Sequence, residues 1–118
     1  MKTILVAEDN DSNYILMTYI LKRQYQYKRA RNGQEAVDMV KEGGIDLVLM
    51  DIKMPVMDGL QATKIIKEQF PDLPVVALTA NAFYSDRQLV FDAGCDEFLA
   101  KPINSAKCLE VISQLVGE

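Results

Sequence analysis

The sequence predicts an α/β protein in which one doubly wound parallel sheet of five strands is covered by five helices. Two observations support this fold class. Short apolar runs alternate with longer amphipathic segments along the chain, a pattern typical of repeated βαβ units. One run, residues 25–30, alternates and is polar, which suits an edge strand of a sheet whose other strands are buried. We therefore expect the strand order 2-1-3-4-5.

The strand-like runs lie at residues 4–7, 25–30, 45–50, 75–79 and 98–101. The first helix is predicted from Asn10 to Arg23. Its apolar residues have helical spacing and are Ile15, Leu16, Tyr19 and Ile20.

Capping residues predict the other four helices. The expected caps are Asn32 with Glu35, Asp58 with Gln61, Ser85 with Gln88, and Asn104 alone. Glycine or proline marks the end of three of these helices, at Gly43-Gly44, Pro71 and Gly94. The apolar positions of the last three helices are Leu60, Ile65 and Ile66, then Leu89 and Val90, then Leu109, Ile112, Leu115 and Val116.

Length and composition indicate one domain over residues 1–118. Hydrophobic residues make up 49% of the chain and charged residues 25%, which is ordinary for a globular protein. Apolar stretches are too short to span a bilayer and the first residues lack a signal-peptide layout, so we expect a cytoplasmic protein without membrane contact. The net charge of −4 argues against nucleic-acid binding through this domain.

Two further features limit the chemistry. The chain contains no histidine, which excludes Ser-His or Cys-His catalysis and histidine metal ligands within it. The spacing of Cys95 and Cys108 fits neither a zinc site nor a redox pair, and we assign these thiols no function.

Polar residues follow four of the predicted strands. Glu8 and Asp9 end the first run, Asp51 ends the third, Thr79 the fourth and Lys101 the fifth. The carboxyl ends of parallel strands share one edge of the sheet, and the expected order places the first and third strands side by side. We therefore expect these residues to line one crevice.

Three neighbouring carboxylates repel one another unless a cation compensates them. Mg²⁺ prefers oxygen ligands and keeps some of its waters, so two carboxylates and a carbonyl suffice for it, and Mn²⁺ is an acceptable substitute. We assign Asp9 and Asp51 as direct ligands, the backbone carbonyl of Lys53 as the third, and Glu8 as a contact through water. A hydroxyl from Thr79 and the ammonium of Lys101 beside this cation suit a phosphoryl group.

Each of these residues also has an ordinary structural interpretation. An acid at a strand end can cap a helix or face solvent, a threonine suits a strand, and Lys-Pro can end a strand in a loop. The bond between Lys101 and Pro102 can instead be cis and aim the lysine into the crevice.

Asp51 is followed by Ile-Lys-Met-Pro-Val-Met-Asp-Gly, in which Pro55 and Gly59 shape a turn that brings the backbone close to a metal. Together with the pair at residues 8–9, Ala-Leu-Thr-Ala at 77–80 and Asp-Glu-Phe-Leu-Ala-Lys-Pro at 96–102, this segment resembles a response-regulator receiver domain of two-component signalling. The resemblance covers essentially the whole chain and implies the flavodoxin-like receiver fold found in hybrid sensor kinases and single-domain regulators.

The resemblance implies that Asp51 accepts a phosphoryl group from a phosphohistidine of a histidine kinase or histidine phosphotransfer protein. Lys101 and Thr79 would neutralise the phosphoryl oxygens. Such a domain catalyses its own phosphorylation and its own slow hydrolysis, so the word enzyme describes it only in part. Because the chain has no histidine, the donor must come from elsewhere.

The implied output is conformational. Thr79 moves toward the phosphoryl group while Phe98 changes rotamer, and the face of the fourth helix, fifth strand and fifth helix is remodelled for a downstream protein. A core aromatic is the alternative interpretation of Phe98. Weak homodimerisation through the fourth-helix face stays open. No effector segment follows Glu118, so we do not expect direct transcriptional control.

Two departures from the family pattern bear on the site. Glu8-Asp9 stands where many relatives have two aspartates, as in receivers of hybrid sensor kinases. Lys53 and Asn81 flank the route of an attacking water and leave the lifetime of the phosphoryl group open. Two rival functions also stay open: a pseudo-receiver that binds partners without being phosphorylated, and a flavodoxin-like cofactor binder, which the acidic first loop disfavours.

Overall fold

The computed structural model of the protein describes residues 1–80 and 84–117, and for residues 84–86 it describes the backbone alone. Five parallel strands form one sheet in the order β2-β1-β3-β4-β5, as predicted. The strands are β1 (Thr3–Ala7), β2 (Gln26–Ala30), β3 (Leu47–Asp51), β4 (Val75–Thr79) and β5 (Glu97–Ala100). The helices are α1 (Asp11–Leu21), α2 (Gly33–Glu42), α3 (Gly59–Gln69), α4 (Tyr84–Asp92) and α5 (Ser105–Val116).

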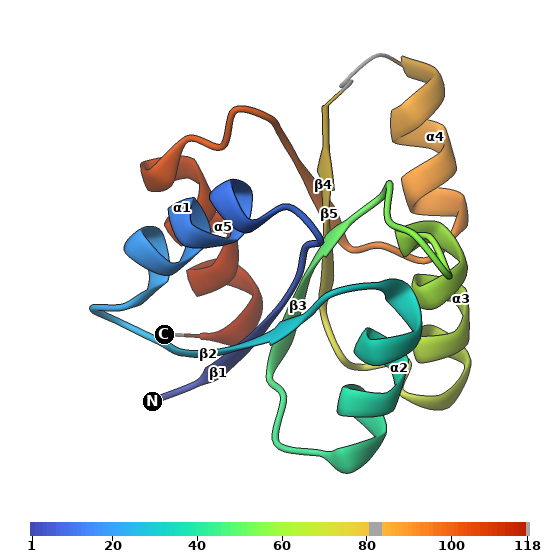
Figure 1. Cartoon of the computed structure of the whole chain (residues 1–118), viewed down its shortest axis with the longest axis horizontal. Coiled ribbons are helices and arrows are strands. Elements are labelled where there is room, and N and C mark those ends of the chain that lie inside the picture. Colours follow the sequence, from blue (N-terminus) through green and yellow to red (C-terminus); the bar gives the residue numbers. More distant parts are fainter. Residues whose placement is uncertain (81–83, 118) are drawn as a thin grey trace.

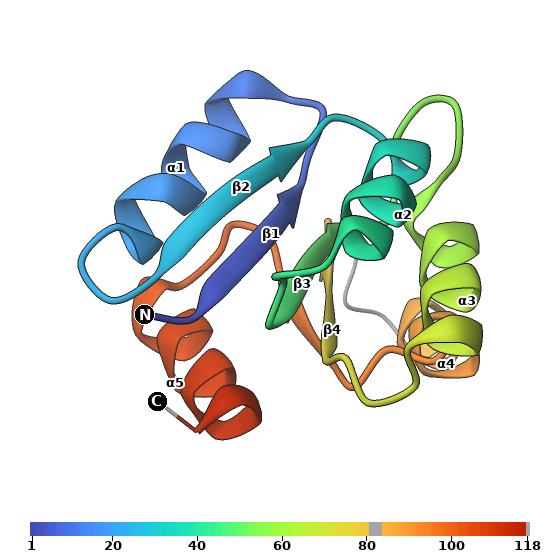
Figure 2. The same ribbon diagram turned by 90° about the horizontal axis from the view of Figure 1, so that it is seen from below.

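Helices cover both faces of the sheet. Helices α1 and α5 lie on one face, and α2, α3 and α4 lie on the other (Figures 1 and 2). Alternate residues of β1 enter the two resulting cores: Ile4 and Val6 pack toward α1 and α5, while Leu5 and Ala7 pack toward α2 and α3. Burial on both faces explains why the central strands are continuous apolar runs.

Strand β2 lies at the edge of the sheet and has three exposed residues, as its polar pattern predicted. The described helices include none that is both long and apolar enough to cross a membrane. The bounds of β1, β2, β3 and β5 differ from the predicted runs by one or two residues, and those of β4 agree. Asp51 is itself the last residue of β3, and β5 begins at Glu97 and ends just before Lys101.

Side-chain caps begin four helices. In each, a side-chain oxygen accepts the backbone N–H three residues later at 2.8–2.9 Å, and the caps are Asn10, Asn32, Asp58 and Asn104. The reciprocal half of the predicted pair at Asn32 is different: Glu35 accepts the N–H of Arg31 at 2.9 Å. The predicted cap at Ser85 is wrong because Tyr84 is already helical, and the Ser85 side chain lies outside what the structure describes.

The apolar residues whose spacing predicted α1 are mostly exposed. Ile20 is buried, whereas Ile15, Leu16 and Tyr19 are 52%, 43% and 64% exposed. The core is filled by Met17, Ile20 and Leu21. Both sets have helical spacing, so the period of the pattern does not distinguish them. As a result, α1 presents apolar side chains to solvent.

Two aspartates fasten the amino ends of the strands. Asp46 precedes β3 and accepts the first N–H of β1, from Thr3, at 2.8 Å. Asp96 precedes β5 and accepts the first N–H of β4, from Val75, also at 2.8 Å. Asp96 also binds the Lys67 ammonium at 2.7 Å. Both acids therefore accept a backbone N–H from the first residue of a neighbouring strand, which would otherwise lack a partner in the sheet.

Candidate functional site

The strand register brings the three predicted acids to one edge of the sheet. Strands β1 and β3 pair Ala7 with Met50, so that Glu8 and Asp51 come next on the two strands. Asp9 follows Glu8 in the loop that leads to α1. The expectation that acids separated by some forty positions become neighbours is thus met by the parallel pairing of the first and third strands.

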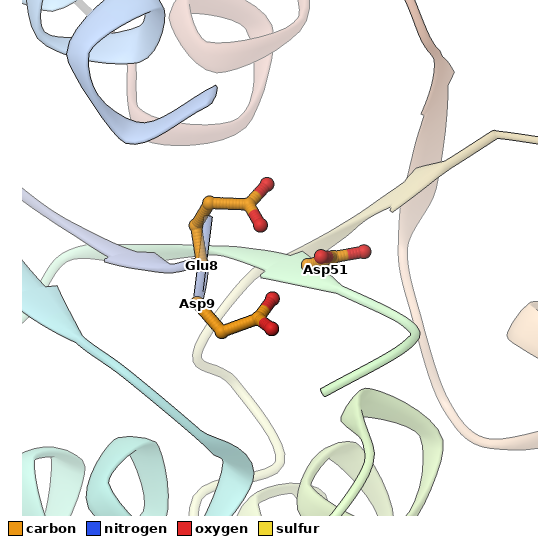
Figure 3. Close-up of side chains that lie close together, drawn as sticks. All are labelled: Glu8, Asp9 and Asp51. Carbon is orange, nitrogen blue, oxygen red and sulfur yellow. The ribbon is translucent and has the colours of Figure 1, made fainter. Parts of the chain in front are cut away.

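The three carboxylates converge on one point (Figure 3). Glu8, Asp9 and Asp51 each offer an oxygen, and these oxygens lie within 4.8 Å of one another. Glu8 is fully buried, Asp51 is 6% exposed and Asp9 is exposed. The cluster therefore has a buried floor and one member open to solvent.

Lys101 is the cation that faces these acids. Its Nζ lies 3.2 Å from Glu8 Oε1 and 3.4 Å from Asp51 Oδ1. Two backbone N–H groups also donate to the acids: that of Asn10 to Glu8 Oε2 at 3.3 Å and that of Lys53 to Asp51 Oδ1 at 3.4 Å. These bonds are long, and one ammonium is shared between two carboxylates, so the negative charge is only partly compensated.

The pKa of Glu8 is raised in this environment. Burial, the hydrogen bond with Asp51 and the negative charge of Asp51 together raise the pKa of Glu8 from 4.5 to about 7. The Asn10 N–H and the Lys101 charge act in the opposite direction but do not offset it. Without a bound cation, the buried carboxyl of Glu8 therefore keeps its proton to a higher pH than an exposed glutamate does.

A cleft of about 820 Å³ opens above the acids, and its lining includes Lys53, Thr79 and Lys101. Thr79 is the last residue of β4 and is buried. Its carbonyl accepts the Lys101 N–H at 2.7 Å, which joins the ends of the fourth and fifth strands. The Lys101–Pro102 bond is cis, one of the two alternatives that the sequence left open. Asn81 lies outside the described residues.

The loop after Asp51 packs its backbone against the strand that it leaves. The Gly59 N–H donates to the Ile52 carbonyl at 2.8 Å, and a Cβ at Gly59 would lie 2.1 Å from the Asp51 carbonyl oxygen. Only glycine fits such an approach. Val56, in the same loop, is 82% exposed and has a φ of 69°, a region that β-branched residues rarely occupy.

Phe98 lies on β5, outside the residues that line the cleft, and is half-buried against the core beneath α4. Its ring meets that of Phe91 edge to face, with 6.1 Å between centroids. The Arg87 guanidinium lies 5.3 Å from the Phe98 centroid. The structure therefore places this aromatic between the core and the exposed surface of α4.

Sequence reasoning missed one residue that holds the acidic loop. Arg29, on edge strand β2, donates to the backbone carbonyl of Glu8 through Nε at 3.1 Å and Nη2 at 3.0 Å. The alternating, polar pattern of residues 25–30 predicted an edge strand, but nothing in the local sequence names the distant partner of Arg29.

The donor set fits a hard divalent cation. All three side chains offer carboxylate oxygens, which Mg²⁺ prefers, and the ammonium of Lys101, which pairs with two of them, leaves negative charge that a divalent ion compensates.

Comparisons with known proteins agree with this geometry. The family model of the response regulator receiver domain matches residues 4–113. The polar-differentiation response regulator DivK of Brucella anthropi is 35% identical over 120 residues, which cover 99% of this chain and 98% of that protein. The chain belongs to the response regulator receiver family, and it is a receiver domain of two-component signalling.

Two solved structures share the fold and more than 30% identity. The receiver domain of the sensor histidine kinase PA1611 from Pseudomonas aeruginosa, with a magnesium ion in its active-site cleft, has a TM-score of 0.92 and 33% identity, covering 99% of this chain and 98% of that one. The co-crystal structure of Saccharomyces cerevisiae Ypd1, a histidine phosphotransfer protein, with the receiver domain of Ssk1 matches with a TM-score of 0.92 and 32% identity, covering 98% of this chain and 89% of that one.

Proposed function

We propose that the protein is a phosphorylation-activated signalling switch in which Asp51 accepts a phosphoryl group from a partner phosphohistidine in a Mg²⁺-dependent reaction. The observation that carries this proposal is the position of Asp51. Its carboxylate lies on the floor of a cleft, beside two other acids and one lysine, with too little positive charge to balance them.

Asp9 and Asp51 are the proposed direct ligands of Mg²⁺, with the Lys53 carbonyl as a third and Glu8 acting through water. Mn²⁺ satisfies the same oxygen donors. The bound cation supplies positive charge where the transferred phosphoryl group carries negative charge. The magnesium ion in the cleft of the similar Pseudomonas aeruginosa domain supports this assignment.

The chain's own residues position the reacting groups. An Asp51 oxygen attacks phosphorus, a P–O bond forms, and the P–N bond to the donor imidazole breaks, so that the imidazole leaves with the bonding electron pair. Lys101, which already lies 3.4 Å from Asp51, then pairs with a phosphoryl oxygen, and the Thr79 hydroxyl donates to another. Catalysis is therefore mainly orientation and charge compensation. Slow hydrolysis of the product uses the same groups.

The chain has no histidine of its own, so the donor phosphohistidine lies outside it, on a histidine kinase or a histidine phosphotransfer protein in this proposal. The co-crystal structure of a similar receiver domain with a histidine phosphotransfer protein supports this class of partner. The exposed apolar side chains of Ile15, Leu16 and Tyr19 on α1 also suit contact with a protein. A two-component phosphorelay of this kind operates in the cytoplasm.

The output is a change of conformation. The phosphoryl group draws Thr79 toward Asp51, and Phe98 leaves its contacts with Phe91 and Arg87 for an inward rotamer. This remodels the face made by α4, β5 and α5, which a downstream protein reads. The same face is where a weak homodimer would form.

A small phosphodonor such as acetyl phosphate, with Mg²⁺, tests the proposal by intact-protein mass spectrometry. We expect one added phosphoryl group on the wild type, none on Asp51→Asn, and none when EDTA replaces Mg²⁺. Wild-type protein that takes no phosphoryl group would instead support the pseudo-receiver, which binds partners without phosphorylation. A flavin titration without spectral change disposes of the cofactor binder.

A further inference from the structure

The peptide bond between Glu8 and Asp9 joins two of the three acids, and a side chain from another strand holds it. Glu8 donates its N–H to the Ala30 carbonyl at 3.0 Å. Its own carbonyl accepts both Nε and Nη2 of Arg29, at 3.1 and 3.0 Å. The register of β1 with β2 ends at Ala7 and Ala30, and the Glu8 N–H makes the last backbone bond, so the guanidinium adds a side-chain bond at the Glu8 carbonyl.

The guanidinium is itself held on two other sides. Its Nη1 lies 2.9 Å from Asp11 Oδ1, and its Cζ lies 4.5 Å from the centroid of the Tyr14 ring. The Arg29 side chain is only 13% exposed. The hydrogen bond and charge of Arg29 also hold the pKa of Asp11 below its ordinary value. A planar fork with several donors can hold a carbonyl and a carboxylate together, which an ammonium cannot.

We propose that Arg29 is a positioning residue for the cation site. By fixing the carbonyl of Glu8, it sets the plane of the Glu8–Asp9 peptide and thereby the directions in which the two side chains leave the backbone. Glu8 and Asp9 consequently present their oxygens toward Asp51 before any cation binds. This inference rests on the proposed Mg²⁺ binding, and it assigns to β2 a part in a site whose acids follow β1 or end β3.

A positioning role and a purely electrostatic role of Arg29 predict opposite changes in Mg²⁺ affinity when the residue is replaced. Arg29 carries a positive charge near the acids, and that charge by itself repels a cation. If charge were its role, a neutral replacement would tighten Mg²⁺ binding. If positioning is its role, the same replacement loosens binding, because residues that orient metal ligands are worth about 10- to 100-fold in affinity.

The test compares Arg29→Gln, Arg29→Lys and Arg31→Gln in the intact chain. Arg31 is a matched control, since it also approaches Asp11, at 3.4 Å, but its side chain is 62% exposed and it has no bond to the Glu8 carbonyl. The Mg²⁺ dissociation constant is measured by calorimetry. We expect it to rise about 10-fold in both Arg29 variants and to stay within about twofold of wild type in Arg31→Gln.

A second measurement separates positioning from general damage to the fold. The rate of phosphorylation by acetyl phosphate is followed against Mg²⁺ concentration, and we expect the Arg29 variants to need more Mg²⁺ for half-maximal rate while the rate at saturation is kept. Arg29→Lys retains the charge, so it carries the test if Arg29→Gln does not fold.

Unchanged or tighter Mg²⁺ binding in a folded Arg29 variant would overturn the inference and leave the proposed function standing. A folded wild type that binds no Mg²⁺ would instead overturn the proposed function, and this inference with it. A loss of unfolding free energy in Arg29→Lys without any change in Mg²⁺ affinity would show a purely structural role, which also overturns the inference.

Discussion

The two edges of the sheet both carry aspartates, but they use them in different ways. At the amino edge, Asp96 is fully engaged, because it accepts the Val75 N–H at 2.8 Å and binds the Lys67 ammonium at 2.7 Å. At the carboxyl edge, one lysine lies 3.2 and 3.4 Å from Glu8 and Asp51. A lysine beside an acid therefore does not by itself distinguish a structural ion pair from a functional site. The functional site is distinguished by its surplus of negative charge.

The contrast is sharpest for the two lysines. We expect Lys101→Met to lower the rate at which Asp51 is phosphorylated by about 100- to 1,000-fold, the usual cost of removing one group that stabilises transition-state charge. Lys67→Met serves as the control, and its rate should match that of the wild type. Mass spectrometry over time after addition of acetyl phosphate and Mg²⁺ measures both. Equal rates in the two variants would break the distinction between the edges.

The aspartates should separate in stability. Asp96→Asn weakens two bonds to a charged acceptor, and we expect the free energy of unfolding to fall by about 1–3 kcal/mol with Mg²⁺ affinity unchanged. Asp9→Asn removes surplus charge, so we expect metal-free stability to hold or rise while Mg²⁺ affinity falls at least about tenfold. Urea denaturation and Mg²⁺ titration of both variants measure this. A loss of Mg²⁺ affinity in Asp96→Asn, or a loss of stability in Asp9→Asn, would contradict the comparison.

A pH series sharpens the same contrast. The pKa of Glu8 is raised from 4.5 to about 7 in the folded protein, so the folded state binds the proton more tightly than the unfolded state does. Protonated Glu8 therefore contributes to the free energy of unfolding. This contribution is fully present below about pH 4.5, is lost as the pH rises through 7, and amounts to at most about 3 kcal/mol. Urea denaturation of the metal-free wild type and of Glu8→Gln from pH 5 to 8 measures this contribution as the difference between their free energies of unfolding. A difference that does not change with pH would rule it out.

The smallest expected effect concerns the coupling of the site to α4. Arg87→Ala removes the cation near the Phe98 ring, a contact worth about 0.5–1 kcal/mol at an exposed position. We expect the inward rotamer of Phe98 to become about twofold to fivefold more populated in the unphosphorylated protein. Aromatic NMR signals of Phe98 measure it. Gln88→Ala, on the neighbouring helix position, is the control and should leave these signals unchanged.

Much of the architecture could be predicted because it depends on local pattern. Apolar runs separated by capped helices imply parallel strands, and the polar run at the edge fixes the strand order, which in turn brings Glu8 beside Asp51. The buried face of α1 could not be predicted, because two apolar stripes on that helix share one period. The core selects the stripe containing Met17. That choice depends on packing against β1 and α5 rather than on the helix's own sequence.

Long-range contacts within the site were also beyond local pattern. Arg29 reads as an ordinary polar residue of an edge strand, and its bond to the Glu8 carbonyl exists only because β1 and β2 pair in a given register. The proton affinity of Glu8 depends on burial and on Asp51, which only a folded structure supplies. The ligand roles of Asp9 and the Lys53 carbonyl stay predictions.

The close approach of Gly59 to the Asp51 carbonyl has a consequence for protein engineering. Since a methyl group there would lie 2.1 Å from a backbone oxygen, helix α3 can start this close to strand β3 only with glycine at this position. A saturation library at position 59 should return glycine alone among functional clones, whereas the solvent-facing neighbour Val56 should accept many replacements. A replacement for the loop between strand β3 and helix α3 has to keep glycine at position 59.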